Sequence, residues 1–198
     1  MKPSLKKMKA FTLIELLMST SIFVLMTTIL MANYPNSLVR SNLFNLSNNT
    51  VLLLREAQVK GSSIDAQRNA LGVDTVTGYG IYFDKINNKI IYFNDKGNMS
   101  SPGNKVYDAG NGEAISTVNI VSGYLINKLR IKNNDSSNSY SDTDSLTVTF
   151  TRPSVKAFFT PITKEVCVEL TTKKNPALVR SIQVYSLGRI VSGPKECP

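Results

Sequence analysis

An unbroken apolar stretch near the N-terminus is the strongest pattern in the chain. Residues 11–32 read FTLIELLMSTSIFVLMTTILMA, and Glu15 is the only charged residue between positions 10 and 37. As an α-helix this stretch would be about 33 Å long, whereas a hydrocarbon core is about 30 Å thick and needs roughly 20 such residues. The pattern therefore predicts a single membrane-spanning helix over residues 11–34, with membrane lipid as a partner.

Glu15 is unusual within this predicted span. A carboxylate inside a membrane helix is costly and usually has a partner. One interpretation is a protonated side chain, or one that reaches back to the interface; the other is pairing with a cation. A cut between Ala10 and Phe11 would create an α-amino group four residues from Glu15, on the same face of the helix.

A second helical pattern follows, in which apolar positions recur every three or four residues. It predicts an amphipathic helix over residues 35–61 whose apolar face lies on a β-sheet; binding a partner protein is the alternative. Pro35 lacks a backbone donor and predicts a kink or interruption. Gly61 predicts the end of the helix. The apolar face consists of Val39, Leu43, Leu46, Thr50, Leu53 and Ala57.

From about residue 78 the pattern changes to short runs rich in Val, Ile, Thr, Tyr and Phe. Residues 80–84 and 89–94 predict a hairpin. No helix-length pattern separates the runs, so the sheets should be largely antiparallel. The predicted fold class is α+β, with the long N-terminal helix packed on a β-rich domain over residues 62–198. The other predicted strands are 114–121, 125–132, 145–152, 155–159, 166–172, 179–186 and a short strand within 187–191.

Residues 133–145 carry almost no apolar side chains and predict an exposed loop. Asp135, Asp142 and Asp144 are conceivable calcium ligands there. Their spacing lacks the glycine and the terminal glutamate of an EF-hand loop, so no metal is expected.

Composition narrows the chemistry further. The 198 residues include no His and only two Cys, which excludes a Ser-His-Asp triad, a Cys-His pair and a His-ligated zinc site. No Gly-rich phosphate loop is present, and the paired carboxylates Asp142 and Asp144 stand in a polar loop that suits acid–base catalysis poorly. Neither an enzymatic activity nor a cofactor is expected.

The net charge of +9 divides between two parts of the chain. Lysines 2, 6, 7 and 9 precede the apolar run, and the positive-inside rule places that end in the cytoplasm. Residues 36–198 hold 19 basic and 13 acidic residues, a net charge of +6. This charge fits either a solvated surface, which we favour, or phosphate contacts. The residues that would contact DNA are Lys173, Lys174, Arg180, Arg189 and Lys195.

The two cysteines, Cys167 and Cys197, both lie in the domain predicted to be exported. An even pair in an oxidising compartment favours a disulfide, which would tie the C-terminal tail to a strand. Such a loop of about 30 residues would stabilise the fold by roughly 3–4 kcal/mol. Two unpaired thiols are the alternative, because a sequence does not show the distance between them.

The segment KAFTLIELL at residues 9–17 resembles the class III signal of type IV prepilins and type II secretion pseudopilins. The shared features are a basic leader, a small residue before the cut, Phe at mature position one and Glu at mature position five. The family usually has Gly where this chain has Ala10. The resemblance implies that residues 1–10 are a leader peptide and that prepilin peptidase cuts after Ala10 and methylates the Phe11 amine. It also implies that Glu15 contacts the Phe11 amine of an adjoining subunit.

A secretory signal peptide is the competing interpretation of the N-terminal segment. Such a peptide carries a small-x-small cleavage site after its apolar run. No such site follows here, because the apolar run leads into Asn33, Tyr34 and Pro35.

One long helix before a β domain resembles the H-type pseudopilins and FimT-like minor pilins, as do residues 54–57 (LREA) and 186–190 (SLGRI). The resemblance implies a minor subunit of a type II secretion pseudopilus or type IV pilus; the alternative is a DNA-binding minor pilin of a competence pilus. Implied partners are prepilin peptidase, other pilins or pseudopilins and the inner-membrane assembly platform; nucleic acid is not expected. The implied location is the inner membrane, with the C-terminal domain periplasmic or extracellular, and then the filament or its tip.

Overall fold

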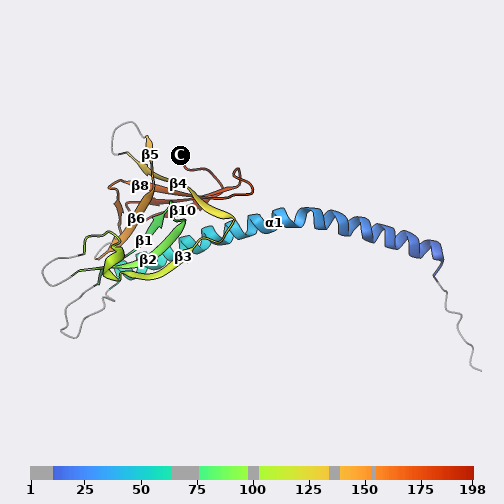
Figure 1. The fold of residues 1–198 in the computed structure, drawn as a ribbon, viewed down its shortest axis with the longest axis horizontal. Helices are drawn as coiled ribbons and strands as arrows, with labels where there is room; N and C mark the ends of the chain where they lie inside the picture. Colours follow the sequence, from blue (N-terminus) through green and yellow to red (C-terminus); the bar gives the residue numbers. More distant parts are fainter. Residues whose placement is uncertain (1–10, 64–75, 98–102, 134–138, 153–154) are drawn as a thin grey trace, which may run out of the picture. The chain divides into compact units, whose positions relative to one another are not determined.

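The computed structural model describes residues 11–63, 76–97, 103–133, 139–152 and 155–198 (Figure 1). The chain divides into two units, residues 1–41 and residues 42–198. Helix α1 (Leu13–Ser62) contributes to both units, and the described strands all belong to the second.

Helix α1 contains the predicted membrane segment and the predicted amphipathic helix in one continuous element. Pro35 lies inside it, so the predicted interruption is wrong, while the alternative of a kink stays a prediction. The residues on both sides of Pro35 are helical, although its nitrogen cannot donate the usual hydrogen bond. The boundary expected between residues 34 and 35 is therefore not a boundary of secondary structure.

The C-terminal part of α1 buries one face in the second unit. Leu43, Thr50 and Ala57 are buried as predicted, whereas Leu46 and Leu53 are only half-buried and their following neighbours lie deeper. The hydroxyl of buried Thr50 donates to the Leu46 carbonyl at 2.9 Å, and this hydrogen bond compensates its loss of water. The buried positions are Leu43, Ser47, Thr50, Leu54, Ala57 and Gly61.

Ten described strands form two five-stranded sheets in which every pairing is antiparallel, as predicted. The predicted hairpin of residues 80–84 and 89–94 is confirmed, with Ile81 opposite Tyr92. The first sheet has the order β3 (Ala114–Asn119), β2 (Lys89–Lys96), β1 (Val76–Asp84), β6 (Ser145–Thr151) and β7 (Ala157–Thr160). The second has the order β10 (Ile190–Gly193), β9 (Val179–Tyr185), β8 (Glu165–Thr172), β4 (Tyr124–Lys132) and β5 (Tyr140–Thr143).

Strand β5 corrects the prediction that residues 133–145 form a loop. Residues 140–143 pair with β4 at the edge of the second sheet, with Asp142 opposite Arg130. The Arg130 Nε lies 2.8 Å from Asp142 Oδ1. Cross-strand backbone and charge pairing stabilises this edge strand. Tyr140 is its one hydrophobic side chain, so its hydrophobic pattern was uninformative. Residues 134–138 lie outside the described part of the chain.

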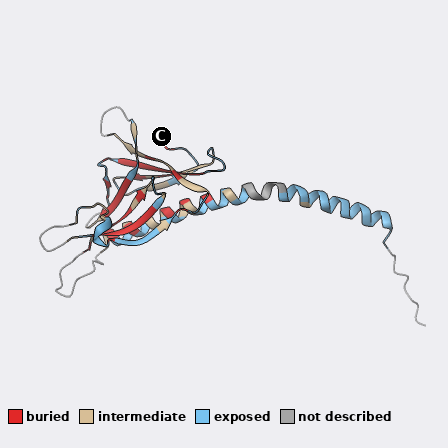
Figure 2. Cartoon of the chain, in the orientation of Figure 1, coloured by how far each residue is buried: buried red, intermediate tan, exposed pale blue. Residues whose placement is uncertain are grey.

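Helix α1 and both sheets share one hydrophobic core (Figure 2). Ile81 of β1 and Val148 of β6 are cross-strand neighbours and fully buried. Val168 of β8 and Ile182 of β9 contribute from the second sheet, and Leu54 from the helix. Residues far apart in the sequence thus bury each other's apolar surface, which stabilises the second unit.

The other face of the first sheet is covered by the segment that contains the short 3-10 helix η1 (Ala109–Asn111). Tyr107 in this segment packs on Phe93 of β2, with ring centroids 5.5 Å apart. Asp95 is fully buried beneath it and accepts hydrogen bonds from the Thr77 hydroxyl and the Lys105 amide at 2.9 and 3.1 Å. Burial raises the pKa of Asp95, although these two donors oppose the shift. The segment thereby fixes the position of Lys105.

Asn88 joins the two sheets. Its backbone has a positive φ of 53° in the turn between β1 and β2, a conformation that asparagine tolerates better than most residues. Its side-chain amide donates to the Tyr124 carbonyl and accepts from the Ile126 amide, both at 2.9 Å. A turn of the first sheet is thus bonded to strand β4 of the second.

The C-terminal tail is fastened to the outer face of the second sheet. Cys167 and Cys197 form a disulfide. Beside it, the buried carboxylate of Glu169 accepts from the Cys197 amide at 2.8 Å and from the Asn127 side chain at 2.6 Å. The Lys128 ammonium lies 3.8 Å from the same carboxylate. Three partners therefore compensate the burial of this charge.

Gly61 provides a test of how closely α1 approaches the first sheet. A Cβ at this position would lie 2.3 Å from the Phe150 carbonyl oxygen of β6. We expect Gly61→Ala to lower the unfolding free energy by about 1–3 kcal/mol, even though alanine favours helices, because the backbone must shift. Denaturant unfolding of the full chain in detergent measures this.

Gly193→Ala is the matched control, because a Cβ there meets nothing within 4 Å. Equal stability of the two variants would contradict the close approach of the helix to β6.

Candidate functional site

The N-terminal end of α1 holds the residues that the sequence singles out. Phe11 precedes the helix and is 87% exposed, whereas Ala10 lies outside the described residues. The Thr12 amide and hydroxyl both donate to Glu15 Oε2, at 3.0 and 2.9 Å. The Glu15 amide donates back to the Thr12 hydroxyl at 3.3 Å. Thr12 and Glu15 thus form a reciprocal capping box.

The capping box gives Glu15 a partner within its own chain. The first amides of a helix lack intrahelical acceptors, and the positive end of the helix dipole favours a carboxylate there. Only cations were considered as partners from the sequence, although the spacing Thr-x-x-Glu at positions 12–15 is itself a signal for this motif. Both bonds from Thr12 go to Oε2, so the second carboxylate oxygen can still accept from another donor.

The segment Leu13–Met31 of α1 is long and apolar enough to cross a membrane. Its mean hydropathy is 2.0, and none of it is buried (Figure 2). Among the described residues it is the one helical segment that meets both conditions. The chain therefore has an N-terminal helix compatible with a single-pass membrane protein.

The hydroxyl groups of this apolar segment are satisfied inside the helix. The Ser19 hydroxyl donates to the Leu16 carbonyl at 3.0 Å, and the Thr28 hydroxyl to the Val24 carbonyl at 2.7 Å. Thr20, Ser21 and Thr27 make equivalent bonds. The polar groups of the segment are thus compatible with lipid, and their small size permits close helix packing.

The five candidate DNA-contacting residues do not form one patch. Lys173 and Lys174 lie in the turn before β9, and Arg189 in the turn after it, at opposite ends of a strand about 20 Å long. The Arg180 guanidinium stacks over the Phe44 ring of α1, 4.9 Å from its centroid. Arg189 stacks in the same way over Tyr185, and Lys195 lies in the C-terminal tail. A phosphate backbone would find no continuous stripe of these cations.

The carboxylates considered for calcium are not assembled into a site. Asp142 pairs with Arg130, and Asp144 is exposed in the turn between β5 and β6. Asp135 lies outside the described residues. Within the described ranges, no three acidic or other ligating side chains come close enough to hold a metal ion.

Gln58, the residue directly after segment 54–57, contacts the second segment, residues 186–190. The side-chain amide of Gln58 in α1 donates to the Gly188 carbonyl at 2.8 Å, in the turn between β9 and β10. Gly188 has a φ of +89°, and a Cβ there would lie 2.2 Å from the Val155 carbonyl oxygen. Residues 186–190 therefore form a tight turn that is bonded to the helix at Gln58.

No protein-family model, no curated protein and no solved structure matches this chain. Its function must therefore be inferred from the residues and contacts described above.

The capping box predicts that the Thr12 hydroxyl protects the first turn of α1. Thr12→Val keeps the shape of the side chain but removes the acceptor for the Glu15 amide. Loss of such a cap costs about 1 kcal/mol, so this amide should exchange about fivefold faster with solvent. Hydrogen exchange of the full chain in detergent, followed by NMR, measures the effect.

Thr20→Val is the control, because its hydroxyl only donates to a carbonyl within the helix. If Thr12→Val and Thr20→Val leave the Glu15 amide equally protected, the capping role is wrong.

Proposed function

We propose that this chain is a pilin-like structural subunit, a minor pseudopilin or minor pilin of a type II secretion pseudopilus or type IV pilus. The observation that carries the proposal is α1 itself. Its exposed apolar segment begins with Glu15 in the first turn and continues without a break into a helix packed on antiparallel sheets. A pilin fold, with the features of H-type subunits, is the architecture we propose for it.

The mechanism is assembly without covalent chemistry. The apolar segment holds the subunit in the bilayer, and packing against other pilin helices replaces its lipid contacts during extraction. Before assembly, Thr12 caps the helix through one oxygen of Glu15. In the filament, the Phe11 amine of an adjoining subunit donates to the other oxygen and neutralises the carboxylate, which favours docking in the correct register.

Processing precedes assembly in this proposal. Prepilin peptidase cuts between Ala10 and Phe11 and methylates the new amine, and the leader lysines keep this end in the cytoplasm. Phe11 lies outside the helix and is exposed. A peptide bond next to such a residue can be bound in an extended form without unwinding α1, which supports the assignment of the cut.

The precursor is accordingly a single-pass protein of the inner membrane with its β domain outside the cytoplasm. The proposed partners are prepilin peptidase, other pilins or pseudopilins and the inner-membrane assembly platform. Neither a cofactor nor a catalytic residue enters the proposed role.

Intact-mass analysis tests the processing step. Co-expression with prepilin peptidase should give a chain that begins at Phe11 and carries one added methyl group. Expression without the peptidase is the control and should give the full 198 residues. An uncut chain in both cases, or a cut near Ala32, would refute the proposal.

Substitution of Glu15 tests the assembly step. Glu15→Val should be cleaved normally but enter filaments at least tenfold less, because it removes the acceptor of the neighbouring amine. Glu15→Gln keeps an oxygen that can cap Thr12 but lacks the charge. Site-specific cross-linking to a neighbouring pilin measures incorporation, with Ser19→Val as the control in the same helix.

The two Glu15 variants separate charge pairing from capping. Defects of similar size support pairing with the amine. A defect in Glu15→Val alone assigns Glu15 to capping, and normal incorporation of both variants contradicts any role in docking.

A further inference from the structure

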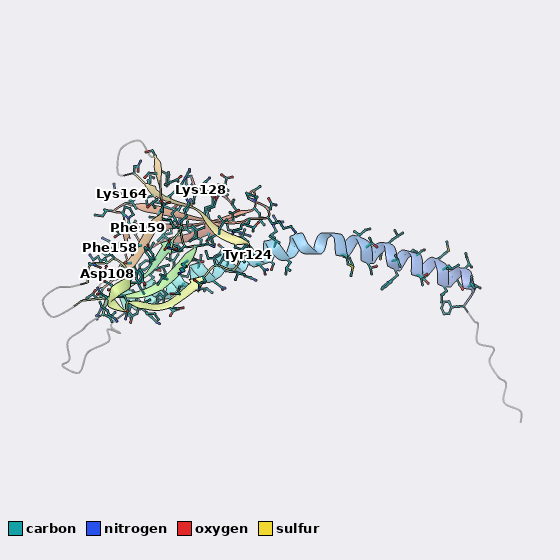
Figure 3. The ribbon with its side chains drawn as sticks, viewed as in Figure 1. Asp108, Tyr124, Lys128, Phe158, Phe159 and Lys164 are labelled. Atoms are coloured by element: carbon teal, nitrogen blue, oxygen red, sulfur yellow. A yellow bond between two sulfur atoms is a disulfide. The ribbon has the colours of Figure 1, made fainter. Side chains whose placement is uncertain are left out.

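The second unit contains a pocket of about 510 Å³ that the proposed assembly role does not use. It is bounded by β7, by Asn104 and Lys105, by residues 162–163 and by residues 186–187. Phe158, Phe159 and Lys164 mark this region in Figure 3. The volume falls within the range of ligand-binding pockets, roughly 300–1,000 Å³.

The backbone of β7 opens into this pocket. β7 is the edge strand of the first sheet, and among the described strands β6 is its one partner. The Ala157 amide points away from β6, since it donates to the Ser186 carbonyl at 2.9 Å. Amide and carbonyl directions alternate along a strand, so the Phe159 amide and carbonyl point the same way. Phe159 therefore presents a donor and an acceptor to an extended chain.

The rim of the pocket is apolar and exposed. Ile162 and Leu187 are 85% and 75% exposed, and Phe158, which also lines the pocket, is exposed as well. Large apolar side chains gathered at one place on a surface are typical of binding sites, whereas single ones are common anywhere. The rim thus offers apolar contacts near the open strand edge.

The charge of the pocket is positive. Lys105 and Lys156 line it, Lys164 is exposed directly beside it, and no acidic residue is among the lining residues. An occupant with carboxylates complements this charge, whereas a basic occupant would be repelled.

Nucleic acid fits the pocket less well than a peptide. Bases bind on free aromatic faces, but the Lys105 ammonium already lies 3.8 Å from the centroid of the Phe158 ring. The open edge of β7 offers a peptide backbone hydrogen bonds that a base or a lipid chain cannot reproduce in this alternating pattern.

We propose that this pocket binds an extended acidic segment of a partner polypeptide, which pairs with the open edge of β7. Its backbone bonds to Phe159, its apolar side chains contact Ile162 and Leu187, and its carboxylates face Lys105 and Lys164. This inference does not depend on the role of α1 in filament assembly.

The test uses the full chain in detergent and a fluorescein-labelled peptide of alternating Val and Glu, measured by fluorescence anisotropy against empty micelles. We expect saturable binding that Leu187→Glu and Lys164→Glu each weaken at least tenfold. Ile86→Glu is the control for the apolar position, since Ile86 is 77% exposed and outside the pocket. Lys174→Glu is the control for the charge, and both controls should bind normally.

Two further probes identify the kind of contact. N-methylation of every second peptide amide should abolish binding in one of the two possible patterns, because only one edge of the peptide pairs with β7. A peptide of alternating Val and Lys should not bind. The proposal is overturned if the Val-Glu peptide does not bind or if the pocket and control variants bind it equally. It is also overturned if only an oligonucleotide or anionic lipid vesicles bind in a pocket-dependent manner.

Discussion

Helix α1 is one continuous helix with two kinds of surface: an exposed apolar segment at its N-terminal end and one buried face at its C-terminal end. The rest of the structure depends on this division. Up to Met31 its side chains are mostly apolar and none is buried, which is compatible with a lipid environment. From Leu43 onward only one face is buried, and small residues at Ala57 and Gly61 let the backbone lie close to β6. The core of the second unit is built around this narrow face, since both sheets contribute to the same cluster.

A segment of the chain lies over the outer face of each sheet. A buried carboxylate of the sheet region binds each of these segments. Glu169 binds the backbone of the tail at Cys197, beside the disulfide. Glu113 accepts from the Lys96 and Asp108 amides and so holds the segment over the first sheet. A backbone amide of the covering segment donates to each carboxylate, and Lys128 lies beside Glu169 as well. These bonds fix irregular segments that have no ladder of their own.

Much of the secondary structure could be predicted from the sequence, because long periodic patterns report burial directly. Residues 80–84 and 89–94 were found in this way, and so was the buried face at Leu43 and Ala57. Strand β5 was missed because its stability comes from pairing with β4 and not from apolar side chains. The β7 pocket could not be predicted, since it joins residues 104–105, 157–160 and 186–187 through tertiary contacts. The spacing Thr-x-x-Glu at positions 12–15 also indicates the capping box, which the interpretation of Glu15 as a partner for a cation did not include.

The capping box changes how Glu15 is understood in an apolar helix. A carboxylate there does not need another subunit in order to be tolerated, since Thr12 and the helix terminus already bind it. The bonds from Thr12 satisfy one oxygen of the Glu15 carboxylate. Among the described residues, no cation compensates its negative charge. A neighbouring amine would add charge pairing without breaking the cap, because it can use the other oxygen. Capping of the helix within one chain and charge pairing with the next subunit of the proposed filament are therefore compatible in the same side chain.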